Sequence, residues 1–166
     1  MRRTLFWLKF LMLTVLLAAQ APAEGPVRPG SAAPPFELEH ALGGRVVLSE
    51  LLTQGPVVIW FADVRGGDPN LRQLGQAAQE AGTRLVLIPV LGPDRETAVG
   101  LAQAETQVTV LLDPDGRVTL LYTGEFVVGV APRENLYVIN RQGTVRAVRF
   151  YPGIPPRVLS GLLQQG

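Results

Sequence analysis

The residues whose types and spacing could do chemistry gather in one loop, between an apolar run at residues 57–62 and a predicted helix. The loop carries two carboxylates, one guanidinium and two glycines: Asp63, Arg65, Gly66, Gly67 and Asp68. Carboxylates can act as general acids and bases, and the free amides of a glycine-bearing helix start can bind an anion. The chain contains no cysteine, so the loop has no thiol nucleophile.

Each of these residues also has a structural interpretation. Asp68 followed by Pro69, ahead of an apolar-periodic segment, is typical of a helix N-cap with proline at the first helical position. The two glycines fit a tight turn, and Asp63 fits an exposed ion pair with the arginine of the loop, which contributes little stability. We therefore predict structural roles here and no catalytic residue.

The N-terminus has the pattern of a secretory signal peptide. A positive start, MRR, precedes the apolar residues 10–19, and the sequence APA ending at Ala23 matches a small-x-small cleavage site. We expect cleavage after Ala23 and export to the periplasm or the extracellular space. The alternative is an uncleaved membrane anchor over residues 4–20. The predicted organisation is a signal peptide (1–23), a Pro- and Gly-rich arm (24–35) and one domain (36–166).

The composition limits the kinds of ligand that this chain is expected to bind. Removal of the leader takes three basic residues with it, which leaves 12 basic against 14 acidic residues and no basic cluster for nucleic acid. A metal site needs at least three convergent ligands, and the only histidine, His40, lies in a predicted hairpin near a turn. We predict no nucleic acid, no metal, no cofactor, and no membrane contact beyond an uncleaved anchor.

The pattern of apolar runs predicts a mixed α/β domain. Two alternating segments around a Gly-Gly turn, 36–40 and 45–49, predict a β-hairpin, and Ser49 is the predicted cap of a short helix. Two continuous apolar runs, 56–62 and 84–90, predict buried parallel strands joined by a helix that ends in glycine. The other predicted elements are a helix over 94–105, a strand over 108–112, a turn over 113–116, a hairpin from 136–140 and 144–151, and a helix from 155.

This order, βαβ followed by ββα behind an N-terminal hairpin, resembles the thioredoxin fold of the redoxin branch, which includes the AhpC/TSA peroxiredoxins and the TlpA-like thiol-disulfide oxidoreductases. Four segments carry the resemblance: GSAAPPFELEHALGGRVVLSELL, PVVIWFA, VTVLLDPDGRV and NLYVINRQGTV. The resemblance covers nearly all of residues 30–166, and these four segments lie between residues 30 and 145. The resemblance implies a thioredoxin-like α/β fold, in which the oxidoreductases keep their active site after the strand that PVVIWFA matches.

The resemblance breaks at the thiol positions. A C-x-x-C motif would place its cysteines at Arg65 and Asp68, and a peroxidatic cysteine would fall near Asp68. Thiol-disulfide exchange and peroxide reduction both need a thiolate, so this chain's own residues exclude both reactions. The resemblance further implies a cis-proline that faces the loop and helps to bind extended peptides. Pro132, between Ala131 and Arg133, matches that position.

Residues 126–130 (FVVGV) admit two interpretations: an ordinary buried segment, or an exposed apolar surface beside Pro132 that would suit a peptide. The resulting hypothesis is an exported, cysteine-less redoxin-type protein that acts as a binding or accessory module for a protein or peptide partner. The alternative is an enzyme, either of the family's thiol-disulfide oxidoreductase or peroxiredoxin type or using non-thiol chemistry at Asp63, Arg65 and Asp68.

Overall fold

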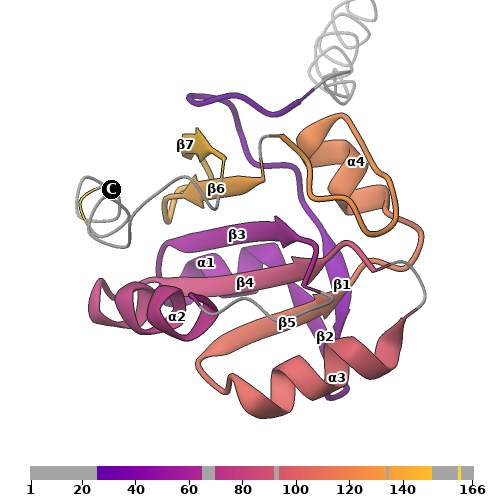
Figure 1. Ribbon diagram of the computed structural model, residues 1–166. Helices are drawn as coiled ribbons and strands as arrows, with labels where there is room; N and C mark the ends of the chain where they lie inside the picture. The colour runs from indigo at the N-terminus through magenta and orange to yellow at the C-terminus, as the bar shows by residue number, and fades with distance from the viewer. Residues whose placement is uncertain (1–25, 65–69, 92–93, 134, 151–160, 162–166) are drawn as a thin grey trace, which may run out of the picture.

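The structure, a computed structural model, describes residues 26–64, 70–91, 94–133, 135–150 and 161. Their elements in chain order are β1 (Glu37–His40), β2 (Arg45–Val47), α1 (Leu48–Gln54), β3 (Val57–Ala62), α2 (Leu71–Glu80), β4 (Arg84–Pro89), α3 (Arg95–Ala104), β5 (Val108–Leu112), α4 (Arg117–Thr123), β6 (Leu136–Ile139) and β7 (Val145–Arg149). Figure 1 shows the strands as one twisted sheet with helices on both sides. Of the predicted tail helix from residue 155, the structure describes only residue 161, which is helical, and the rest lies outside the described residues.

The seven strands lie in the order β2-β1-β5-β4-β3-β6-β7. β3, β4 and β5 run parallel, whereas β1, β2, β6 and β7 pair antiparallel with their neighbours. The predicted hairpins and the βαβ unit of β3, α2 and β4 are therefore confirmed. This mixed sheet with four helices is the thioredoxin-like arrangement.

Both faces of the sheet are covered, which explains why β3 is apolar at every position. Its six residues are all buried. Because successive side chains of a strand point to opposite faces, its even-numbered residues pack with α2 and α3, and its odd-numbered residues pack with α1 and α4. Figure 1 shows α2 and α3 on the near side of the sheet and α1 behind it.

One helix start differs from the sequence prediction. α1 begins at Leu48 with Val47 at the N-cap, so Ser49 lies inside the helix and is not its cap. α2 begins at Leu71 with Asn70 at the N-cap, and the predicted cap, Asp68, lies outside the described residues. α1 does not need the predicted cap to be fixed in place, because it buries Leu48 and Leu51 against the sheet.

The start of α3 agrees with the prediction. The Thr97 N–H donates to Asp94 Oδ1 at 3.1 Å, and the Thr97 hydroxyl donates to Asp94 Oδ2 at 2.8 Å. These hydrogen bonds hold the pKa of Asp94 below its usual value, and the bond from the Thr97 backbone N–H has the largest effect. Asp94 is thus an N-cap, although it lies close to the end of the sheet that carries chemistry in many α/β proteins.

Helix α4 is absent from the sequence prediction, which places only a turn at residues 113–116. The turn exists, with Gly116 at a φ of 68°. Asp113, only 3% exposed, then caps the helix that follows. Its carboxylate accepts from the Val118 N–H at 3.3 Å, the Thr119 N–H at 2.8 Å and the Thr119 hydroxyl at 2.7 Å.

The N-terminal arm, where it is described, packs along the domain. The Val27 N–H donates to the Tyr122 carbonyl oxygen at 2.8 Å, and the Gly30 N–H donates to the Val145 carbonyl oxygen at 2.7 Å. The Tyr122 hydroxyl donates to the Pro34 carbonyl oxygen at 2.8 Å, and burial raises the pKa of Tyr122. The arm is therefore tied to both α4 and β7. None of the described helices is long and apolar enough to cross a bilayer.

Candidate functional site: the carboxyl end of the parallel strands

The loop singled out by the sequence leaves the sheet at the carboxyl ends of β3 and β4. Ala62 pairs with Pro89 at this edge, and the Val90 N–H donates to the Ala62 carbonyl oxygen at 2.8 Å. Asp63 follows and is exposed, and Val64 turns back into the core. The other four loop residues lie outside the described residues, so their roles stay predictions: Arg65, Gly66, Gly67 and Asp68.

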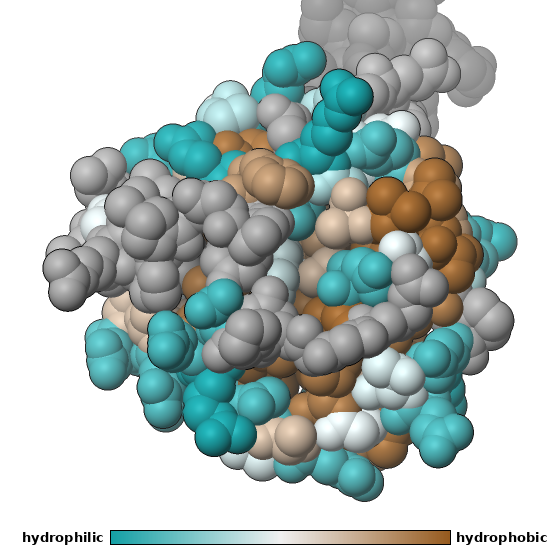
Figure 2. All heavy atoms as spheres, viewed as in Figure 1, coloured by the Kyte–Doolittle hydropathy of each residue, from teal (hydrophilic) through white to brown (hydrophobic). Residues whose placement is uncertain are grey.

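Beside this edge lies the valine segment, residues 126–130. Its three valine side chains are exposed, at 60% for Val127, 53% for Val128 and 54% for Val130. Figure 2 shows hydrophobic surface on the side of the molecule where Figure 1 places α4 and the chain that follows it. Of the two interpretations left open by the sequence, an exposed apolar surface is confirmed for these valines.

Two contacts hold the valine segment in place while its valines face solvent. The buried Gly129, at a φ of 76°, donates its N–H to the Val90 carbonyl oxygen at 2.6 Å, which fastens the segment to the end of β4. The half-buried ring of Phe126 lies over Gly116, so closely that a Cβ at Gly116 would overlap it. Val127 and Val130 bridge each other across the turn, with the Val130 N–H donating to the Val127 carbonyl oxygen at 3.0 Å.

The residues that the resemblance implies for peptide binding continue from this segment into β6. Ala131 is half-buried, Pro132 is buried and Arg133 is exposed. The Arg133 N–H donates to Glu125 Oε1 at 2.7 Å. Because the Asn135 carbonyl oxygen accepts from the Phe61 N–H at 2.8 Å, the chain just before β6 lies beside the carboxyl end of β3. The geometry thus brings these residues to the same edge as Asp63.

The described part of this edge presents one exposed carboxylate, Asp63, beside the exposed valines. Within the described residues no group of three histidines, cysteines, aspartates or glutamates is placed to hold a metal ion. His40 lies at the β1–β2 turn, where its Nδ1 accepts from the Leu42 N–H at 3.1 Å. The exposed apolar side chains at this edge stand on a backbone segment that is hydrogen-bonded to the sheet. Leu120 on α4 is also exposed, at 53%. The sequence pattern does not indicate it, because α4 itself is not predicted from the sequence.

Comparison with known proteins supports the fold. No protein-family model matches the sequence, and no curated protein is found to match it. Similar structures include a peroxidoxin, BcpB, from Mycobacterium tuberculosis, with a TM-score of 0.65, 21% identity, and coverage of 84% of this chain and 97% of that one. A secreted Mycobacterium tuberculosis disulfide oxidoreductase homologous to E. coli DsbE has a TM-score of 0.61, 19% identity and coverage of 79% and 96%. A putative thiol:disulfide interchange protein DsbE from Chlorobium tepidum has a TM-score of 0.61, 22% identity and coverage of 84% and 97%.

These similarities extend over most of both chains, while the identities are low enough that they establish the fold alone. The redoxin-type folding pattern inferred from the sequence is confirmed. The sequence contains no cysteine at the positions that the resemblance assigns to thiols, or anywhere else. The chain therefore has the thioredoxin-like fold of peroxiredoxins and DsbE-like thiol-disulfide oxidoreductases, without the residue on which their chemistry depends.

Proposed function

We propose that this chain is an exported binding module that holds a protein or peptide partner against the valine segment, without thiol chemistry of its own. The observation that carries the proposal is the exposure of Val127, Val128 and Val130 on a segment that Gly129 fastens to the end of β4. Burying each of these half-exposed side chains would gain about 1 kcal/mol. A partner that covers all three gains enough to bind.

The form of the surface favours an extended partner. The valine segment is a tight turn flanked by the buried Pro132, and its apolar side chains stand within a few residues of one another. Extended peptides bind such surfaces by placing alternate side chains against apolar patches. Arg133 and Asp63, both exposed, supply polar groups at the same edge of the sheet.

Export supports the same proposal. The N-terminal sequence has the charged start, apolar run and small-residue site of a leader. One of the similar structures is described as a secreted disulfide oxidoreductase. An exported thioredoxin-like protein without cysteine would meet partner polypeptides in a compartment where disulfides form, and it would bind them without exchanging disulfides.

The test is a quantitative pull-down from the exporting cell with the mature protein as bait. We expect a variant carrying Val127→Ser, Val128→Ser and Val130→Ser to recover at least about tenfold less of the partner, because it loses the apolar gain of three side chains. The matched control is Leu42→Ser, which removes an equally exposed apolar side chain from the β1–β2 turn. Equal recovery by the triple variant and the control, or recovery of no protein by the wild type, would contradict the proposal.

A further inference from the structure

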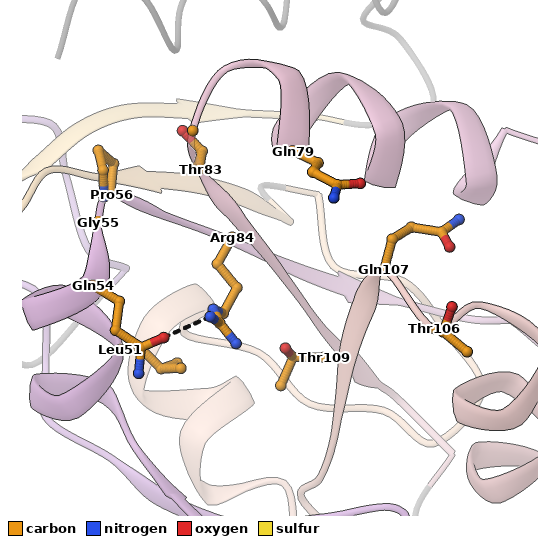
Figure 3. Close-up of a pocket in the computed structure, with 11 residues that line it drawn as sticks. Leu51, Gln54, Gly55, Pro56, Gln79, Thr83, Arg84, Thr106, Gln107 and Thr109 are labelled. Carbon is orange, nitrogen blue, oxygen red and sulfur yellow. Dashed lines mark hydrogen bonds between the residues drawn. The ribbon is translucent and has the colours of Figure 1, made fainter.

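A concave site lies at the opposite end of the sheet from the valine segment. It is a cavity of about 320 Å³, formed where α1 and α2 end and where β4 and β5 begin (Figure 3). β4 starts at this cavity with Arg84 and ends next to the valine segment, about 20 Å away at the usual rise of a strand. The cavity is therefore separate from the proposed binding surface, and its use would not depend on that surface.

Arg84 supplies the only charge among the residues that line the cavity, which are Leu51, Gln54, Gly55, Pro56, Gln79, Gly82, Thr83, Arg84, Thr106, Gln107 and Thr109. Its Nη2 donates to the neutral Gln54 Oε1 at 2.6 Å. Arg45, Arg72, Arg95 and Arg117 each pair with a carboxylate. Among the described residues no such pair is formed by Arg84, nor by Arg28, Arg133, Arg141, Arg146 or Arg149. Figure 3 shows the Arg84 side chain extending between Gln54 and Thr109.

Arg84 is exposed, and within the part of the chain that the structure describes no carboxylate pairs with it. The carboxylate that contacts a lining side chain is Glu105, which accepts from Gln107 Nε2 at 3.0 Å. Glu105 is already paired with Arg72 at 3.2 Å. The other polar lining groups are hydroxyls and amides, which are neutral. A small negative ligand would thus meet one guanidinium and no opposing carboxylate from the lining residues.

A purely structural role explains Arg84 less well. An arginine near the end of a helix can serve the last free carbonyl oxygens. At the end of α1 that contact is made by Arg141, whose Nη2 donates to the Gln54 carbonyl oxygen at 3.4 Å. The exposed side chain of Arg84 instead donates to the Gln54 side chain beside the cavity.

We propose that this cavity binds a small polar anion, in which a carboxylate or phosphate group meets Arg84 and a hydroxylated body meets Thr109 and the amides of Gln79 and Gln107. A guanidinium offers paired donors that match the oxygens of either group. The volume lies near the lower limit of ligand sites, which suits a metabolite of a few carbons. The polar lining disfavours an apolar ligand.

The test is a calorimetric titration of the whole mature protein with succinate and with glycerol 3-phosphate, in buffers matched for ionic strength with NaCl. We expect saturable binding of at least one anion, with a Kd in the millimolar range. Tighter binding of succinate would indicate recognition of a carboxylate, and tighter binding of glycerol 3-phosphate would indicate recognition of a phosphate. Glycerol is the neutral probe and should not bind measurably. No saturation by either anion beyond the NaCl baseline, or equal binding of glycerol, would overturn the proposal.

Two variants locate the binding. Arg84→Gln should weaken the anion affinity at least about tenfold, because it removes a charge-assisted contact. Arg95→Gln, which removes an exposed arginine distant from the cavity, should change it less than about twofold. Thr109→Val keeps the side-chain shape, so it provides an independent reading should Arg84→Gln fold poorly, and it should also weaken binding. Equal affinities in Arg84→Gln or Thr109→Val and in Arg95→Gln would contradict the site.

Discussion

Replacing Asp113 by alanine should lower the free energy of unfolding by about 3 kcal/mol, which is a large share of the stability of a domain this size. The carboxylate is buried and accepts three hydrogen bonds, two from backbone N–H groups at the start of α4 and one from the Thr119 hydroxyl. Alanine would leave those donors without their acceptor in a site that water does not reach. Chemical denaturation followed by circular dichroism measures the effect.

Asp115 provides the matched control, because it lies in the same turn and carries the same side chain. It is exposed and pairs with Arg117 at 2.7 Å on the surface. Asp115→Ala should therefore change the free energy of unfolding by less than about 1 kcal/mol. If Asp113→Ala and Asp115→Ala prove equally stable, the buried cap does not hold α4 as described.

Replacing Gly116 by alanine should destabilise the protein by about 3 kcal/mol and displace the valine segment as well. Gly116 has a φ of 68°, which costs a residue with a side chain about 1 kcal/mol. The added Cβ would also overlap the ring of Phe126, which must then move. Because Phe126 is one of the two anchors of the valine segment, this variant should lose partner binding at temperatures where it remains folded.

Gly82→Ala separates the two causes. Gly82 has a similar φ of 64°, but a Cβ there would meet no atom within 4 Å. It should cost only the backbone term, about 1 kcal/mol, and leave partner binding unchanged. A Gly116→Ala variant that is no less stable than Gly82→Ala, or that binds the partner normally, would show that the contact with Phe126 does not position the valine segment.

The sheet and most helices could be predicted because their signals are local. The runs in β3 and β4 are apolar at consecutive positions, as strands covered on both faces require, and glycine marks the end of α2. α4 could not be found this way. It has seven residues, three of them β-branched, and its capping carboxylate lies four residues before it, at Asp113. Without the helix, Leu120 could not be placed.

The candidate site depends on contacts that the sequence does not display. Three valines in a row of apolar residues normally predict burial, and what exposes them is the hydrogen bond between Gly129 and Val90 and the fit of Phe126 over Gly116. The hydrogen bond joins two residues that are far apart in the sequence, and the ring contact joins two residues that no sequence pattern relates. The polar cavity could not be predicted from the sequence either, because the ends of several elements form it around Arg84.

The most direct measurement of the central claim is an amide chemical-shift map of the mature protein, titrated with linear peptides selected against it from a random display library. The account predicts saturating shifts concentrated at residues 126–133 and at Val64 and Leu91, and their loss in the triple valine-to-serine variant. Shifts concentrated at the β1–β2 hairpin or at the cavity around Arg84, or no peptide that saturates them, would contradict it.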